Sequence, residues 1–340
     1  MILETKSIVF SNKLIHWQST YGRNNLPWQE NKTAYRVWVS EIMLQQTQVS
    51  TVINYYDKFI KVFPTVEILA KADLQDVLAQ WSGLGFYRRA QNLHKCAQII
   101  HHQHQNIFPR TALELKQLPG IGRSTAAAIS SICFNAPEAI LDGNVKRVLT
   151  RYFYLTPEDQ KEKDMITLAQ ALVPKQKSGQ YTQAIMDMGA TICTKHQPKC
   201  PSCPVNSDCM SHKNGIISHV LTTRIKQRKA NYHYLIIEND DHWLFKLRGE
   251  EGIWANLWTP PEFKTLHDLN SVIKPSKRIK LATTKHTLSH IIMNITFWKC
   301  DINDLKLMPK GSIRWHPYLL PTEFATPKPF TTLLKEIHND

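Results

Sequence analysis

The chain of 340 residues contains no run of about 18 apolar residues, the length that a membrane-spanning helix needs. Its first residues, Met1-Ile-Leu-Glu-Thr-Lys, lack a basic region followed by an apolar segment, the pattern of a secretory signal. We therefore expect that no part of the chain spans or crosses a membrane. Acidic residues are also few, because 28 Asp and Glu stand against 42 Lys and Arg.

The resulting formal charge of +14 is spread along the chain and is not confined to a basic tail, since residues 1–220 carry +8 and residues 221–340 carry +6. A compact, evenly basic protein favours a polyanionic partner, of which nucleic acid is the foremost class. The length predicts about two domains, each with its own core. No internal repeat is present.

The first 220 residues are predicted to form a helical domain. Apolar residues recur there at three- and four-residue spacing, with Pro or Gly in the short loops between the segments. The clearest such segments are Asp73–Trp81, Tyr87–His102, Ala112–Leu118 and Ser124–Phe134. Residues 221–230 carry four basic side chains and no acidic one, which predicts a basic linker.

Residues 231–340 have a different period and predict a smaller α+β domain. Tyr232–Glu238 and His242–Leu247 flank a turn sequence, as in a β-hairpin. Apolar residues then alternate from Ile291 to Phe297, the pattern of a half-buried strand. Leu333–Ile337 predicts a closing helix. The fold class is therefore mainly α, followed by a smaller α+β unit.

Four of the seven cysteines lie in one short run with the spacing C-x6-C-x2-C-x5-C: Cys193, Cys200, Cys203 and Cys209. Four thiolates this close together can hold one soft metal centre, for which an iron–sulfur cluster is favoured. The alternatives are a structural zinc ion, which usually has paired C-x2-C knuckles, and two disulfides. Either metal centre implies a reducing compartment.

Leu118-Pro119-Gly120-Ile121-Gly122-Arg123-Ser124 lies between two helical patterns. Its glycines allow a tight turn and leave bare N–H groups at the start of the next helix, which suits a phosphate. An ordinary turn between packed helices is the alternative. Arg123 at the start of the helix favours the phosphate site.

Glu41 is predicted to lie on the apolar face of a helix, together with Val37 and Leu44. A carboxylate on such a face must be protonated, paired or functional. Desolvation raises its pKa, as a general acid near neutral pH requires. The alternative is a buried salt bridge to an arginine such as Arg36 or Arg89.

Asp142 precedes a helical run, where Asp is most often an N-cap. In a cleft, the same carboxylate could stabilise a developing cation. A proton donor and a fixed negative charge together meet the demand of breaking a bond at an anomeric carbon.

Residues 23–215 resemble the helix-hairpin-helix base-excision glycosylases that carry a C-terminal iron–sulfur loop. The shared pieces are six ordered motifs: Leu26-Pro-Trp28, Ser40–Thr47, Gly83–Tyr87, Leu118–Thr125, Leu141–Arg147 and the four cysteines. Within that superfamily the resemblance is closest to MutY-type adenine glycosylases. Endonuclease III-type enzymes have a nucleophilic lysine where this chain has Ser124, and serine cannot form a Schiff base.

The resemblance assigns roles to these residues. Glu41 would protonate the departing adenine, Asp142 would stabilise the oxocarbenium-like sugar, and the four cysteines would hold a [4Fe-4S] cluster. Leu26 and Trp28 would line the adenine pocket. The DNA-contacting residues would be Gln46, Phe86, Tyr87, Gly120, Gly122, Arg123 and Ser124, with a monovalent cation at the hairpin. Phe86 stands where the family commonly has tyrosine, and it retains a ring able to intercalate.

The C-terminal domain resembles the MutT-like, Nudix-fold module of the same family. Its acids after Pro261 are isolated, so no magnesium-binding glutamate cluster is present, and the module should bind without hydrolysing. Leu288, Ser289 and His290 correspond to the loop that recognises 8-oxoguanine. Leu288 replaces the usual phenylalanine.

The implied protein is a monofunctional DNA glycosylase that removes adenine opposite 8-oxoguanine or guanine in double-stranded DNA. It is expected to be a monomer, and cytoplasmic and nucleoid-associated if bacterial. An endonuclease III-like or thymine-mismatch glycosylase is the alternative enzyme. A non-catalytic iron–sulfur DNA-binding protein is the alternative of another class, but it would not need both Glu41 and Asp142. A nucleotide-pool hydrolase is disfavoured by the missing acidic cluster.

Overall fold

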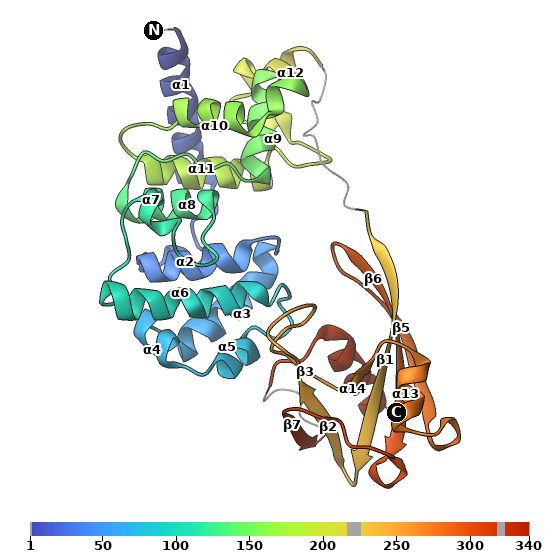
Figure 1. Ribbon diagram of the computed structural model, residues 1–340. Coiled ribbons are helices and arrows are strands. Elements are labelled where there is room, and N and C mark those ends of the chain that lie inside the picture. The colour runs from blue at the N-terminus through green and yellow to red at the C-terminus, as the bar shows by residue number, and fades with distance from the viewer. Residues whose placement is uncertain (1, 216–225, 318–323, 340) are drawn as a thin grey trace. The chain divides into compact units, whose positions relative to one another are not determined.

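The computed structural model describes residues 2–215, 226–317 and 324–339 (Figure 1). Its internal contacts divide the chain into two compact units. The first, here the helical unit, consists of Met1–Lys71 and Asn92–Thr222. The second, here the sheet unit, consists of Ala72–Gln91 and Thr223–Asp340. The segment 72–91, expected within the helical domain, is thus grouped by its contacts with the sheet-containing part of the chain.

The described part of residues 1–215 is helical, as the spacing of apolar residues predicts. Four short 3-10 helices, Pro27–Gln29, Glu158–Gln160, Cys200–Ser202 and Asn206–Asp208, complete it. The α-helices are α1 (Ile2–Tyr21), α2 (Ala34–Leu44), α3 (Val49–Val62), α4 (Val66–Lys71), α5 (Leu74–Gln80), α6 (Arg88–His104), α7 (Ala112–Leu115), α8 (Arg123–Phe134), α9 (Gly143–Phe153), α10 (Glu162–Ala171), α11 (Ser178–Thr191) and α12 (Met210–Lys213).

Local sequence determines where several of these helices begin. Asp73 accepts a hydrogen bond of 2.7 Å from the amide of Gln75 and so caps α5. Thr111 and Glu114 form a reciprocal capping box at α7. Such caps satisfy amides that have no partner inside the helix and stabilise it by about 1 kcal/mol each. The capping box therefore stabilises the start of α7, the short helix that precedes the turn before α8.

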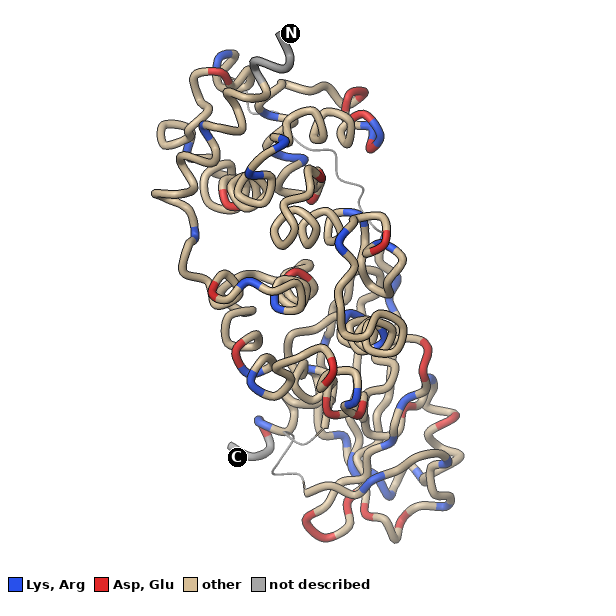
Figure 2. The backbone as a smooth tube through the Cα atoms, turned by 90° about the vertical axis from the view of Figure 1, so that its left-hand side faces the viewer, with Lys and Arg blue, Asp and Glu red and all other residues tan. Residues whose placement is uncertain are grey.

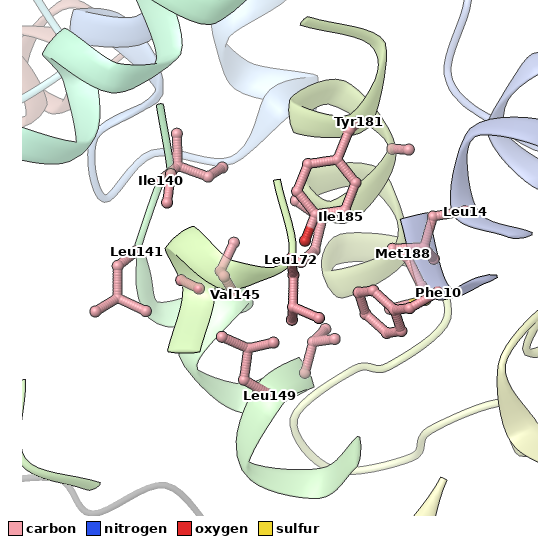
Figure 3. Close-up of a cluster of buried hydrophobic side chains, with 14 of the residues drawn as sticks. Phe10, Leu14, Ile140, Leu141, Val145, Leu149, Leu172, Tyr181, Ile185 and Met188 are labelled. Atoms are coloured by element: carbon pink, nitrogen blue, oxygen red, sulfur yellow. The ribbon is translucent and has the colours of Figure 1, made fainter. Parts of the chain in front are cut away.

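The core of the helical unit lies around α11, which packs against α1, α8 and α9. Figure 3 shows the buried side chains that these helices contribute, among them Phe10 from α1, Leu149 from α9 and Ile185 from α11. The strand-like segment Ile140–Leu141 enters the same cluster directly before Asp142. The start of α9 is thereby fixed to the core on both sides.

The sheet unit contains a mixed sheet in the order β3-β2-β1-β6-β5, with β4 paired to β1 and β7 to β2. β1 and β6 run parallel, and the other pairs are antiparallel. The elements are β1 (Arg228–Asn239), β2 (His242–Leu247), β3 (Trp258–Thr259), β4 (Glu262–Phe263), α13 (Leu266–Val272), β5 (Ile279–Thr287), β6 (Ile291–Asp301), β7 (Ile313–Pro317) and α14 (Lys328–Asn339), with 3-10 turns at Pro275–Lys277 and Ile302–Asp304.

Each face of this sheet has its own apolar cluster. Tyr234, Met293 and Phe297 belong to a cluster that includes Phe330 of α14. On the other face, Leu235 and Cys300 pack with Leu269 of α13. β1 begins at Arg228, so the last three residues of the predicted basic linker 221–230 belong to the strand, and residues 221–225 lie outside the described residues. Pairing with β6 extends the strand to this point.

In the part of the chain that the structure describes, no helix is long and apolar enough to cross a membrane. Figure 2 marks the charged residues along the backbone, and lysines and arginines occur in both units. The even charge distribution read from the sequence is thus carried by folded segments.

Leu149 provides a test of the core of the helical unit. Its side chain is fully buried, so Leu149→Ala should lower the free energy of unfolding by about 2–5 kcal/mol through lost transfer energy and a residual cavity. Urea unfolding followed by helical circular dichroism measures this change. Leu113→Ala is the matched control, because Leu113 is 74% exposed and its truncation should change stability little. Equal losses in the two variants would contradict this account of the core.

Candidate active site

Glu41 lies in the last turns of α2, whose first amides are capped by Thr33. Its neighbours Val37, Trp38 and Ile42 are buried, whereas Glu41 itself is half-buried. Burial, and to a smaller extent the nearby charge of Asp142, together raise the pKa of the Glu41 carboxyl to about 7. Near neutral pH this side chain therefore holds a proton in a large fraction of molecules.

No cation contributes to the raised pKa of Glu41, whose causes are burial and Asp142. The salt-bridge alternative for this carboxylate therefore finds no support within the described residues. The Arg36 guanidinium instead acts electrostatically on Tyr35 and Tyr56, opposing the rise in pKa that burial causes in each, and the Arg89 guanidinium donates to the Gly85 backbone oxygen. Glu41 is thus a carboxylic acid that is shielded from water without a compensating positive charge.

Asp142 is the N-cap of α9, so the interpretation as a helix cap is confirmed. Its Oδ1 accepts a hydrogen bond of 2.8 Å from the Val145 amide, and its Oδ2 accepts one of 3.2 Å from the Asn144 side chain. These two hydrogen bonds fix the carboxyl group at the positive end of the helix dipole. The cap also holds Asp142 close enough to influence Glu41 electrostatically. One residue therefore serves as both cap and fixed charge.

Asn144 and Arg147 connect Asp142 to the cysteine loop, a connection that the sequence did not predict. Arg147 Nη2 donates to Asn144 Oδ1 at 2.8 Å, and Arg147 Nε donates to the backbone oxygen of Cys193 at 2.7 Å. Gly189 on α11 permits the close approach, because a Cβ there would lie 2.8 Å from the Asn144 Cβ. Both residues stand in the Leu141–Arg147 motif, but the motif gave no hint of their partners.

The four cysteines line one cavity of about 210 Å³ next to α9. All four are half-buried, and Arg151 Nη1 lies 3.4 Å from the Cys193 sulfur. The same guanidinium donates to the backbone oxygens of Thr194 and Lys195. Among the described residues, no three His, Cys, Asp or Glu side chains converge closely enough to hold a single metal ion. The thiols therefore surround a space and do not meet at one point.

The turn before α8 has the backbone that the glycine pattern predicts. Gly120 has φ of 77°, and a Cβ there would lie 2.8 Å from the Asn92 Cβ, so any other residue is disfavoured. Gly122 is the N-cap of α8, and both Gly122 and Arg123 are exposed. Ser124 is half-buried, and its hydroxyl accepts from the Leu141 amide at 3.4 Å. The exposed N-terminus of α8 can accept an anion.

Gln46 and Phe86 share an uncommon backbone conformation. Their φ angles are 57° and 51°, in the left-handed region that non-glycine residues adopt only at a cost of about 1–3 kcal/mol. Both side chains are exposed, Phe86 to 50%. Tyr87 is instead half-buried and its hydroxyl accepts from the Gly83 amide. Strained, exposed positions of this kind are typical of functional contacts.

Leu26 and Trp28, predicted to line a base pocket, are buried, and Trp28 packs edge-on against Tyr56. The loop that carries them is anchored by Asp187 of α11, which is fully buried. Arg23 forms an ion pair of 2.7 Å with this carboxylate and also donates to it from its backbone amide. Asp187 was not singled out from the sequence, because an acid within a helix has no local pattern that marks it as buried.

In the sheet unit, Leu288, Ser289 and His290 form the tight turn between β5 and β6. The Leu288 amide donates to the Ile291 oxygen at 2.9 Å. The Leu288 side chain packs against the sheet core, whereas Ser289 and His290 are exposed. Only the last two residues of this predicted recognition loop are therefore presented outward.

The raised pKa of Glu41 makes the stability of the protein depend on pH. As pH rises from about 4.5 to 7, the unfolded chain releases a proton that the folded protein keeps, so stability falls over this interval. Glu41→Gln removes that loss and should be more stable than the parent at pH 8 by on the order of 2 kcal/mol. Urea unfolding at pH 5 and pH 8 measures the effect. The exposed Glu162→Gln retains Glu41 and should lose stability between pH 5 and pH 8 as the parent does, so an equal pH dependence in the two variants would contradict the raised pKa of Glu41.

Comparisons with known proteins agree with this geometry. The HhH-GPD superfamily of base excision DNA repair proteins matches residues 39–175, and the NUDIX domain matches residues 232–336. The chain is 38% identical over 341 residues to the adenine DNA glycosylase of Buchnera aphidicola subsp. Baizongia pistaciae, covering 97% of each chain. It is 41% identical over 216 residues to the human adenine DNA glycosylase, covering 60% of this chain and 39% of the human protein.

Among solved structures, a thermostable thymine-DNA glycosylase matches with a TM-score of 0.57 at 28% identity, covering 62% of this chain and 98% of that one. An endonuclease III–DNA complex matches with a TM-score of 0.54 at 20% identity, which shows the shared fold. The fold class predicted from the sequence, a helix-hairpin-helix glycosylase followed by a smaller Nudix-like α+β domain, is confirmed. Because the chain is 38–40% identical to curated adenine DNA glycosylases over 84–97% of its length, it belongs to the adenine DNA glycosylase family of the HhH-GPD superfamily.

Proposed function

We propose that this protein hydrolyses the N-glycosidic bond of adenine that is mispaired with 8-oxoguanine or guanine in duplex DNA. The observation that carries the proposal is the pairing of a half-buried, protonatable Glu41 with the cap carboxylate Asp142. One group can donate a proton near neutral pH, and the other is held in place by hydrogen bonds. Membership of the adenine DNA glycosylase family supports adenine as the leaving base.

The adenine must leave the base stack, because its glycosidic bond is inaccessible inside the duplex. Glu41 then gives its proton to the purine, so that the bond electrons depart on a neutral base. Positive charge develops on the sugar, and the Asp142 carboxylate stabilises it. Water adds to the anomeric carbon and loses a proton to the Glu41 carboxylate, which restores the acid. Asp142 can serve because its cap hydrogen bonds hold it in place before the reaction.

The reaction ends at base removal, because the hairpin provides serine where a Schiff-base lysine would be needed. Ser124 has a half-buried hydroxyl that accepts from the Leu141 amide. It lacks the amine that strand cleavage by that route requires. The exposed amides at Gly122 and Arg123 would instead bind a backbone phosphate, together with a monovalent cation. Ser289 and His290 would contact the base opposite adenine.

The cysteine loop suits an iron–sulfur cluster. Its four donors are all thiols that line one cavity, and cysteine thiolates are the ligands that hold iron–sulfur clusters. Cys193, Cys200, Cys203 and Cys209 would hold a [4Fe-4S] cluster, whose bound irons cross-link the loop as a structural group. Arg147 and Arg151 then keep this loop attached to α9 through the Cys193 and Thr194 oxygens.

Glu41→Gln tests the acid assignment. Glutamine keeps the shape of the side chain but has no acidic proton, so base release should fall at least about 100-fold while duplex binding changes little. The measurement is single-turnover release of adenine from a duplex with one 8-oxoguanine·adenine pair, followed by alkali to cleave the abasic site. The control Glu162→Gln changes an exposed acid and should leave the rate unchanged.

Excision at the parent rate by Glu41→Gln would reject this role. Strand breaks before the alkali step would instead show lyase chemistry. A parallel set of thymine-glycol and G·T duplexes tests the alternative of an endonuclease III-like or thymine-mismatch enzyme, which would cleave these in preference to the adenine mispair.

Cys203→Ser tests the metal centre. Loss of one thiolate should lower the iron bound per protein molecule and destabilise residues 193–213, because each ligand cross-links the loop. Iron and acid-labile sulfide analysis of the purified protein measures the first effect, and protease sensitivity of the loop measures the second. Cys133→Ser is the matched control, since Cys133 lies on α8 outside the loop. Zinc in place of iron in the parent protein would contradict the cluster.

A further inference from the structure

One face of the sheet next to the 288–290 turn is polar and exposed. Register pairs Asn231 with Asn294 and Asn294 with Lys285, so that these three side chains form a row across β1, β6 and β5. The row towards the turn contains Lys229, and the row away from it contains His233. Alternate residues such as Met293 and Ile295 point to the opposite face, where they enter the core.

This face carries positive charge that no unpaired acid before Asp301 offsets along its strands. β5 contains no Asp or Glu, β6 contains none before Asp301, and the one acid of β1, Glu238, forms an ion pair of 2.7 Å with Lys299. Lys229 and Lys285 are exposed, and neither forms an ion pair with any described residue. The Asn294 amide donates to Asn231 Oδ1 at 3.0 Å, which leaves the Asn231 amide hydrogens available as donors. The rows therefore offer several donors and no competing anion.

Arg278 borders the same face and has unused hydrogen-bonding capacity. Its guanidinium stacks on Trp298 at 4.7 Å from the ring centre. Its Nε and Nη1 atoms are buried and have no hydrogen-bond partner among the described residues. Buried guanidinium donors are almost always paired, because leaving them unpaired costs free energy. No ion pair with a described acid neutralises this guanidinium, so its positive charge is added to that of the face.

His233 adds a further donor beside Arg278. The Trp298 indole donates to His233 Nδ1 at 3.4 Å, so the neutral ring carries its hydrogen on Nε2. Asp304, an acid at the end of this region, is already paired with Lys277 at 3.0 Å and does not neutralise Arg278. The positive groups Arg278, Lys229 and Lys285 thus lie at three places on one continuous face.

We propose that this face, formed by Lys229, Asn231, His233, Arg278, Lys285 and Asn294, binds the phosphate backbone of the substrate duplex. The proposal rests on duplex DNA being the substrate. Successive residues on one side of a strand are about 7 Å apart, so the face spans roughly 20 Å and can meet several phosphates in line. Such contacts position a protein on DNA without selecting sequence. They would place the exposed Ser289 and His290 against a base.

The test is the salt dependence of DNA binding by the full-length protein. A double variant, Lys229→Gln with Lys285→Gln, removes two exposed charges and should not disturb folding. A triple variant adds Arg278→Gln. The slope of log affinity against log salt should decrease by about 2 in the double variant and about 3 in the triple variant. Affinity at low salt should fall roughly tenfold or more, equally for duplexes with and without 8-oxoguanine.

Lys277→Gln is the matched control, because that cation belongs to the same module but is paired with Asp304. Single-turnover adenine release by Lys277→Gln should match that of the parent, so the control variant shows that a charge change in this module does not by itself alter catalysis. If the double variant keeps the salt slope of Lys277→Gln, the face does not contact phosphates and the proposal is wrong. If the parent binds duplex with a steeper salt dependence than the double variant but releases no adenine, the proposed reaction is wrong, while the proposal that this face binds phosphate is supported.

Discussion

The proposed chemistry depends on holding the Asp142 carboxylate beside a carboxylic acid that keeps its proton near neutral pH. The start of α9 fixes Asp142, because the Val145 amide and the Asn144 side chain donate hydrogen bonds to its two oxygens. On α2, burial and the nearby charge of Asp142 raise the pKa of Glu41 to about 7 and so favour its protonated form. The two side chains therefore have different surroundings, as the roles of acid and anion require.

The placement of Asp142 extends to the metal loop through hydrogen bonds. Asn144 and Arg147 lie one and two turns into α9 and connect the cap to the Cys193 carbonyl. The close contact of Gly189 with Asn144 holds α11 against the same helix. A disturbance of the cysteine loop would therefore reach Asp142. Under the proposed function, this connection would give a cluster held by the loop an influence on catalysis without a role in the reaction.

The positive side chains on the sheet lie next to the turn that contains Ser289 and His290. Ser289 and His290 alone present little area to a duplex. The adjoining strands add unpaired lysines, and Arg278 adds buried donors without acceptors. Binding energy from backbone contacts and recognition by the turn would then come from one rigid sheet. Leu288, which replaces the phenylalanine usual at its position, contributes by packing beneath the turn.

Sequence periodicity and motifs were sufficient to predict the helical part, the hairpin of β1 and β2, the alternation in β6 and the family. They also marked Glu41, Asp142 and the four cysteines, because each lies in a local pattern with few chemical meanings. The sequence could not give Asp187, the bridge through Arg147, or the unpaired donors of Arg278. These depend on which distant segments meet: a buried charge or an unused donor is defined by its three-dimensional neighbours, and no local spacing encodes them.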